Sequence, residues 1–436
     1  MRPVFRQEAQ VTYRIAGIDV HKRMLAVVIA DVAVEGEYQF ERRRVGTSPS
    51  ELCRLADWLV AQQVDEVVME STAQYWRPVW ATLEQRWRLK RLQESDGARS
   101  GQLHLAQAQS NRGAAGRKKD FPDAERLVKR LVAQELKLSF VPDVEQRLWR
   151  TIMRRKHQLT RNRVQFQNRL ECLLEEAHIK LSSLVSDLLG KSARYMLQAV
   201  AEGETNPETI AALADHRLRA TAPQLRDALG ACRDLHPVYR QLLKMALEEL
   251  KLMEEQIDKL EQEMANLLSA QQDVVQRLAE VPGLGVDSAQ QIIAEVGPQA
   301  AAFPSAKHLA SWVGVCPGEE ESAGVNYSHR SPKGNRQMKG LLNQASNAAV
   351  KTKGSIFEFI YRRLVVRLGH AQAIGAIAHR LCRLIWMILH QAIRYEERGP
   401  AVSRSTTERR AAKMIRELRR LGYRIEPVEC KAEGSV

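Results

Sequence analysis

Four short runs rich in β-branched and aromatic residues lie within the first 71 residues, and they restrict this part of the chain to an α/β fold. Three of them, YRIAGIDV, MLAVVIAD and YQFERRRV, fall between residues 13 and 45, which predicts an antiparallel meander. A helical stretch, SPSELCRLADWLVAQQ, precedes the fourth run, VDEVVMES, and another helix is expected around Tyr75 to Gln85. This alternation predicts a sheet covered by helices.

Acidic residues follow the strands and open a later helix. Asp19 ends the first run and Glu70 ends the fourth, so the two carboxylates meet at one sheet edge if those strands are neighbours. Asp120 and Asp123 flank Pro122 at an expected helix start, where residues three apart can face the same side. Singly, each acid is explained by a strand end or a helix N-terminus. Together they predict a site for Mg²⁺ or Mn²⁺, because hard cations prefer oxygen ligands.

The charge balance indicates a polyanionic partner. A net charge of +14 and a pI near 9.6 favour phosphate contacts, although charge alone does not separate DNA from RNA or an anionic membrane. We find no run of about 18 apolar residues and no signal-peptide core at the N-terminus, so we expect a cytosolic protein with no membrane partner. The cysteines are scattered without metal-ligand spacing, so we expect them to be reduced and ordinary.

A long basic helix is expected from about Asp143 to Lys180. Its excess of one charge sign is too lopsided for i,i+4 ion pairing, so we predict contact with a nucleic-acid backbone rather than a merely solvated face. The predicted contacts are Arg147, Arg150, Arg154, Arg155, Lys156, Arg161 and Arg163.

An apolar seam with heptad spacing runs from Leu243 to Leu267. It is compatible with an intramolecular helical hairpin or with an oligomerisation element, since one seam does not reveal its partner. We hypothesise self-association as a dimer or higher oligomer.

Two C-terminal segments carry candidate chemistry. LAEVPGLGVDSAQQIIAEVG (residues 278–297) predicts a helix-hairpin-helix, in which Gly283 and Gly285 let backbone amides approach a phosphate; ordinary helix caps are the alternative. The polar loop from Cys316 to Gly340 contains three serines beside cations, and a serine hydroxyl there can attack a phosphodiester. Composition does not choose among Ser322, Ser328 and Ser331.

The order of these motifs resembles a known family. GIDVHK, VVMES and RKKDFPDAERL, followed by VPGLGVDSAQQIIAEVG, FPSAKHLASWVGVCPGEEESAG and SPKGNRQMK, are similar to the DEDD transposases of the insertion sequence 110/1111 family, the bridge-RNA-guided (seeker-RNA-guided) serine recombinases. The resemblance extends from Arg14 to about Tyr395. Many relatives have Gly-Gly after the serine that corresponds to Ser322, whereas this chain has Ala323 and Gly324 at these positions.

The resemblance implies a RuvC-like domain of the RNase H fold (residues 12–142), a basic helical and coiled-coil region (143–274) and a helical transposase domain (275–397). The basic tail (398–436) lies outside the family's pattern. The resemblance also implies metal binding by Asp19, Glu70, Asp120 and Asp123, and it makes Ser322 the nucleophile that forms a covalent phosphoserine link. Lys333 and Arg336 become phosphate contacts. The implied partners are an element-encoded guide RNA, donor and target double-stranded DNA, and further copies of the chain in a dimer or tetramer in the bacterial cytosol.

Two alternatives stay open. A metal-dependent nuclease of Holliday-junction type would use the same acids with water as the nucleophile. In a non-catalytic nucleic-acid-binding protein the acids would be structural, and the basic helix and the hairpin would carry the function.

Overall fold

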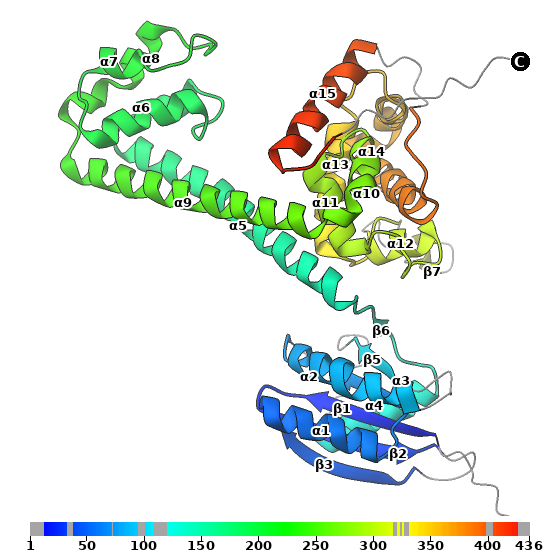
Figure 1. Ribbon diagram of the computed structural model, residues 1–436. Helices are drawn as coiled ribbons and strands as arrows, with labels where there is room; N and C mark the ends of the chain where they lie inside the picture. Colours follow the sequence, from blue (N-terminus) through cyan, green and yellow to red (C-terminus); the bar gives the residue numbers. More distant parts are fainter. Residues whose placement is uncertain are drawn as a thin grey trace, which may run out of the picture. The chain divides into compact units, whose positions relative to one another are not determined.

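The computed structural model, drawn in Figure 1, divides into two compact units, Met1–Pro142 and Asp143–Val436. It describes residues 13–32, 38–71, 73–94, 101–107, 120–316, 321–322, 325–326, 331–397 and 404–425, and only the backbone at 94, 321–322, 325–326 and 404–407. The first unit combines a sheet with helices and the second is mostly helical, as the sequence predicts.

The first unit is built on a six-stranded sheet with the order β3-β2-β1-β4-β5-β6. The predicted meander is confirmed by the antiparallel pairs β1·β2 and β2·β3, while β4 pairs parallel with β1. Strands β5 and β6 were not predicted. The elements are β1 (Arg14–Val20), β2 (Met24–Asp31), β3 (Phe40–Gly46), α1 (Pro49–Ala61), β4 (Glu66–Glu70), α2 (Trp76–Thr82), a π-helical turn η1 (Leu83–Arg88), α3 (Leu89–Glu94), β5 (Gln102–Ala106), α4 (Asp120–Val132) and β6 (Leu138–Ser139).

Helices cover both faces of this sheet. Alternation along β1 sends Ala16 and Ile18 into a core with α1, α2 and η1, and it sends Ile15 toward Ala124 and Val128 of α4. The face that carries the odd-numbered residues of β1 is therefore the face against which α4 packs.

The second unit has two hydrophobic cores connected by two long helices, α5 and α9, which lie side by side (Figure 1). Its elements are α5 (Val144–Glu176), η2 (Leu181–Ser183), α6 (Lys191–Glu202), α7 (Pro207–Ala211), α8 (Ala222–Ala228), η3 (Gly230–Asp234), α9 (Pro237–Leu267), η4 (Ser269–Gln271), α10 (Gln272–Ala279), α11 (Val286–Val296), α12 (Ala306–Val313), β7 (Glu321–Ser322), β8 (Val325–Asn326), α13 (Arg336–Ala349), α14 (Ile356–His390) and α15 (Arg404–Arg420).

The apolar seam of α9 is used within the chain. Leu243, Leu250 and Met253 are buried in one core with the C-terminal half of α5, and Met264 is buried in the other core with Trp149 of α5. The two helices therefore form an antiparallel intramolecular hairpin. Because these seam residues already have a partner in the same chain, they give no support to self-association through the seam.

Helix α14 is long and apolar enough, by length and composition, to cross a membrane. Half of the qualifying window is buried inside the unit, and Ile377, Leu381 and Ile385 belong to its main core. Burial of this kind is typical of a core helix, so no membrane span is indicated.

The basic tail contains a packed helix. Leu418, Leu421 and Tyr423, in and just after α15, are buried in the same core as α10 to α14, and the Gln290 side-chain amide donates a hydrogen bond to the Tyr423 hydroxyl (3.1 Å). Residues 404–425 are therefore part of the second unit's fold, although their composition predicted only a basic extension.

Candidate functional site

The first two acids of the predicted cluster lie opposite each other in the sheet. The parallel register of β1 and β4 pairs Asp19 directly with Glu70. Glu70 ends β4, and Asp19 is the last residue but one of β1. Alternation places both on the α4 face, because Val68, two residues before Glu70, packs with Leu127 of α4. The expectation that these carboxylates meet at one sheet edge is confirmed by this register.

Helix α4 brings the other two acids to the same edge. Asp120 and Asp123 lie in its first turn, where carboxylates are favoured by the helix dipole. The helix can come this close because β1 has a glycine beneath it. A Cβ on Gly17 would lie only 2.4 Å from the carbonyl oxygen of Ala124, one residue after Asp123.

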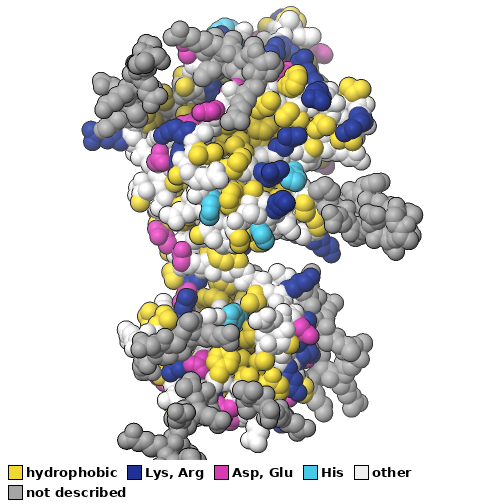
Figure 2. Space-filling view, turned by 90° about the vertical axis from the view of Figure 1, so that its right-hand side faces the viewer, with side chains coloured by type: hydrophobic (Ala, Val, Ile, Leu, Met, Phe, Trp, Pro, Cys, Tyr) yellow, Lys and Arg dark blue, Asp and Glu magenta, His cyan; other side chains and the backbone are white. Residues whose placement is uncertain are grey.

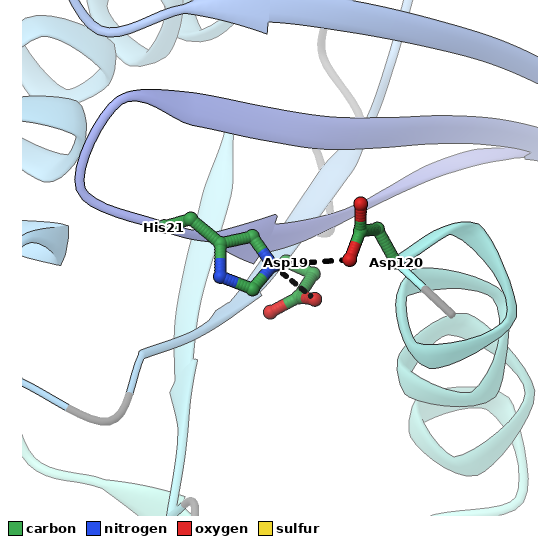
Figure 3. Close-up of side chains that lie close together, drawn as sticks. All are labelled: Asp19, His21 and Asp120. Carbon is green, nitrogen blue, oxygen red and sulfur yellow. Dashed lines mark hydrogen bonds and ion pairs between the residues drawn. The ribbon is translucent and has the colours of Figure 1, made fainter. Parts of the chain in front are cut away.

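A histidine that sequence reasoning missed joins two of these acids. The Nε2 atom of His21 lies 3.0 Å from Oδ2 of Asp19 and 3.4 Å from Oδ1 of Asp120, as Figure 3 shows. One ligand atom from each of the three residues fits within a group 4.8 Å across. The available signal was the spacing in GIDVHK, since residues two apart along an extended strand face the same side.

The electrostatics of this cluster are those of crowded carboxylates. Burial raises the pKa of Asp19 above its ordinary value of 3.8; His21 opposes the shift, and the negative charges of Asp123 and Asp120 add to it. Asp123 also accepts a hydrogen bond from Arg126 at 2.6 Å, which offsets part of its charge. Such a group of oxygen atoms and one imidazole can hold a divalent cation.

The predicted nucleophile lies in the other unit. Ser322 belongs to β7, which pairs antiparallel with β8 so that Ser322 is opposite Val325. Of the two other candidate serines, Ser328 lies outside the described residues, and Ser331 accepts a hydrogen bond from Lys339 Nζ at 2.6 Å.

Three of the predicted nucleic-acid contacts on α5 bind residues of α11. Arg154 forms a two-bond pair with Glu295 of α11 at 2.8 and 2.9 Å, and Arg150 donates to the carbonyl of Ala294 on the same helix. Lys156 is buried between Asp287 and Glu261. These contacts show that the prediction of an unpaired basic face was wrong for these residues. Their carboxylate partners lie 91 or more residues away in sequence and so were not visible in the local charge pattern.

The remaining cations of this run differ from one another. Arg163 pairs with Glu254 of α9 at 3.0 Å, so it too helps to hold the hairpin of α5 and α9 together. Arg155 and Arg161 are exposed and form no ion pair with any described residue. Arg147 is partly buried. A nucleic-acid contact stays a prediction for these residues and fits Arg155 and Arg161 best.

The turn between α10 and α11 occurs where a hairpin was predicted, but its first glycine has a different role. Gly283 has a φ of +86°, and a Cβ there would lie 2.2 Å from the carbonyl oxygen of Ala345 in α13. Glycine is therefore required at position 283 by close packing of the chain on itself rather than by a phosphate. A Cβ on Gly285 would meet only Glu417, at 3.9 Å, so its phosphate contact stays a prediction.

The two cations predicted beside the nucleophile are both exposed. Arg336 begins α13 and lines a groove of about 1100 Å³, whereas Lys333 is not among the described residues that line it. The start of α13 is fixed by Asn335, which caps the helix and donates a hydrogen bond to the buried Glu295 at 2.9 Å.

Comparison with known proteins gives three matches. A family profile described as transposase, of the IS110 DEDD type, matches residues 16–179, and the profile of the transposase IS116/IS110/IS902 family matches residues 275–362. The chain is 29% identical over 125 residues to an uncharacterized 43.6 kDa protein of insertion element IS110 from Streptomyces coelicolor. That similarity covers 28% of this chain and 31% of that protein. These matches support a DEDD transposase of the IS110/IS116/IS902 family.

Proposed function

We propose that the chain is an insertion-element transposase that cuts and exchanges DNA strands with a metal-binding acidic cluster and a serine nucleophile. The observation that carries the proposal is the meeting of Asp19, His21 and Asp120 at one sheet edge, inside the region that matches the DEDD transposase profile. Ser322 lies inside the region that matches the second transposase profile. Both parts of the proposed site thus fall within matched regions, in the expected order.

The fold of the first unit is compatible with a RuvC-like domain. Its parallel pair β1·β4 continues an antiparallel meander, and the acids lie at the ends of these central strands. We assign residues 12–142 to this domain, 143–274 to the basic helical region, 275–397 to the transposase domain and 398–436 to the tail. The helix-hairpin-helix assignment of residues 278–297 is supported by the helix, tight turn and helix found there.

The residues at the sheet edge suit a divalent cation. Asp19, Glu70, Asp120 and Asp123 would supply oxygen ligands, and the pKa of Asp19 is already raised, first by burial and then by its acidic neighbours. Mg²⁺ or Mn²⁺ bound there would supply positive charge to a phosphate whose negative charge increases during the reaction. The imidazole of His21 is an acceptable ligand for Mn²⁺ and makes that ion a useful probe.

The serine step exchanges a phosphodiester bond within DNA for a phosphodiester bond between DNA and the protein. The Ser322 hydroxyl oxygen would attack a backbone phosphorus and lose its proton, while the bond from that phosphorus to one sugar oxygen breaks and the sugar oxygen takes up a proton. The phosphoserine link conserves the bond energy, so that the hydroxyl of another strand can attack it and release the serine. No oxidant, reductant or nucleotide is needed.

The resemblance to RNA-guided relatives supports two further partners. Base pairing with an element-encoded guide RNA would select donor and target sequences, while the protein would contact the backbone of the paired strands. An assembly of two or four chains would allow the serine and the acids acting on one phosphate to come from different subunits. Mixing Ser322→Ala chains with Asp19→Asn chains tests this, because activity recovers only when the two residues can act from separate subunits.

A covalent-adduct assay tests the proposed function. Wild-type protein, incubated with guide RNA, Mg²⁺ and a nicked suicide DNA substrate, should give a protein-DNA adduct on a denaturing gel. Ser322→Ala should abolish the adduct and leave RNA binding intact, and Ser328→Ala serves as the matched control that should retain it. Asp19→Asn should abolish the adduct and lower the affinity for Mn²⁺ at least about tenfold.

The assay also separates the alternatives. Strand cleavage without an adduct would favour a nuclease that uses water, and metal-independent binding without cleavage would favour a non-catalytic protein. Full adduct formation in EDTA, or loss of the adduct only in Ser328→Ala, would overturn the assigned residues.

A further inference from the structure

A groove of about 1100 Å³ lies in the second unit beside α13 and α14. Its walls come from Gly314 to Cys316, which follow α12, from the first turns of α13, and from α14 between Leu368 and Arg383. All of these elements belong to one compact unit and share one hydrophobic core. The groove is therefore a feature of a single folded body.

The groove lining is positively charged. Its described residues include three arginines and one lysine but no acidic side chain. Arg336, Arg380 and Arg383 form no ion pair with any described residue, and Lys339 donates only to the neutral Ser331 hydroxyl and the Pro332 carbonyl. The pKa of His379 is lowered by burial and then by the charges of Arg383 and Arg380. The positive field of this wall is thus left unbalanced within the described part of the chain, which favours an anionic occupant.

Two helical glycines form an open part of the same wall. Gly340 lies within α13 and Gly375 within α14, where glycine costs up to about 1 kcal/mol relative to alanine. A Cβ at either position would meet no other atom within 4 Å, so packing of the chain on itself does not require glycine there. This contrasts with Gly283, whose Cβ would collide with α13. Absence of a side chain at Gly340 and Gly375 instead permits close approach of a ligand to the helix backbone.

The composition of the wall distinguishes backbone contact from base recognition. No described lining residue is Phe, Tyr or Trp, so the groove lacks the large aromatic platforms on which single-stranded bases stack. Cations combined with small residues match the demands of a sugar-phosphate backbone, which needs charge neutralisation and a close surface. Figure 2 shows Lys, Arg and His side chains interspersed with hydrophobic ones on one face of the second unit.

The groove also lies at both ends of the segment that carries Ser322. Cys316 and Ser331, which flank residues 317–330, both line it. The two flanks are held together by glycines, because a Cβ on Gly314 would lie 2.6 Å from the Pro332 carbonyl oxygen and one on Gly334 would lie 2.3 Å from the Val313 carbonyl oxygen. This close contact fixes the groove wall at the two ends of the segment that carries the proposed nucleophile.

We propose that this groove binds the backbone of DNA, with Arg336, Lys339, Arg380 and Arg383 contacting phosphates and Gly340 and Gly375 forming the surface against which the strand lies. The choice of DNA rests on the proposed function, since the phosphate attacked by the serine belongs to DNA. Contacts of this kind go to phosphates, which carry no sequence information directly.

Salt dependence of binding by the full-length protein tests the charge contribution. The double variant Arg380→Gln/Arg383→Gln should bind a 40-base-pair DNA duplex at least about tenfold more weakly and lower the slope of log K against log salt by about 2. Arg219→Gln/Arg226→Gln, which removes two exposed arginines near α8, is the control and should leave the slope unchanged. An unchanged slope in the groove variant, or loss of binding to an RNA duplex alone, would overturn the proposal.

Filling the groove gives a test that folding defects cannot imitate. Gly375→Ala should raise thermal stability or leave it unchanged, and Gly375→Leu should keep the fold while weakening DNA binding at least about tenfold. Ala348→Leu places the same leucine side chain at an exposed position of α13 outside the described groove lining and should leave binding unchanged. Undiminished DNA affinity of Gly375→Leu would refute the groove as the binding surface.

These outcomes are distinguishable from failure of the proposed function. If wild-type protein binds DNA through the groove but never forms an adduct, the groove proposal stands and the serine mechanism fails. If the groove variants bind normally while Ser322→Ala loses the adduct, the mechanism stands and the groove proposal fails.

Discussion

Replacing Gly17 with alanine should damage both the stability of the first unit and its metal site. Gly17 is paired with Val28 of β2 and Val68 of β4 in the middle of the sheet. A Cβ there would lie 2.4 Å from the Ala124 carbonyl oxygen and 2.8 Å from Cγ2 of Val128, where 3.4 Å is the lower limit of ordinary contact. Because the nearer neighbour is backbone, rotation of a side chain cannot relieve the collision.

The size of the effect follows from this geometry. Moving the Ala124 oxygen from 2.4 to 3.4 Å shifts the start of α4 by about 1 Å away from β1. Overpacking of this kind costs about 1–3 kcal/mol, and the lower chain entropy of unfolded alanine offsets up to about 1 kcal/mol of that. The same shift lengthens the 3.4 Å contact between His21 and Asp120. We therefore expect Mn²⁺ affinity to fall about tenfold and adduct formation to fall about a hundredfold.

Local hydrogen exchange is the suitable stability assay, because a chain with two units does not unfold in one two-state step. Peptides from β1 and α4 should exchange faster in Gly17→Ala, whereas peptides from α10 to α14 should be unchanged. Gly46→Ala is the control, since the three atoms nearest to its Cβ all belong to the carboxyl group of Glu51, the end of a side chain that can rotate away. Wild-type protection of α4 together with wild-type Mn²⁺ affinity in Gly17→Ala would refute the dependence of the site on this close packing.

Two further predictions concern the second unit. Glu295→Gln should destabilise it by about 3 kcal/mol, because Arg150 and Arg154 lose their buried carboxylate. Burial raises the pKa of Glu295, but the hydrogen bond and charge of Arg154 and the charge of Arg150 outweigh burial, so the net pKa lies below 4.5. The stabilisation by ionised Glu295 is therefore present above pH 4.5 and lost as the pH falls through the pKa of the folded state. The stability of the Glu295→Gln variant, measured by urea titration, should depend less on acid pH. Burial raises the pKa of Cys382 to about 12, so iodoacetamide at pH 8 should label exposed Cys172 rapidly and Cys382 only after unfolding; fast labelling of native Cys382 would contradict its burial.

The sheet was predictable where apolar residues form nearly continuous runs, and a strand was missed where its run is short and mixed with polar residues. β1, β2 and β4 are dominated by buried aliphatic residues, and the positions of Asp19 and Glu70 near the ends of two such runs predicted that they share one edge. β5 was missed because Gln102 and His104 interrupt its short apolar pattern. His21 was missed because a residue just beyond a strand has no period of its own, although it follows Asp19 at the strand's spacing.

Charge was less predictable than apolar pattern, because a cation's role depends on partners that are distant in sequence. Arg154 and Arg383 both stand in basic helical segments, and nothing local distinguishes them. Arg154 faces Glu295, 141 residues away, whereas Arg383 faces a groove whose described lining has no carboxylate. The net charge of +14 therefore shows that cations are in excess, but it does not show where in the fold the unpaired cations lie. In the folded chain, many cations of α5 form ion pairs, whereas those of the groove at the ends of the Ser322 segment have no described carboxylate partner. Phosphate contacts are therefore expected where cations lack ion pairs within the chain rather than where arginines are most frequent in the sequence.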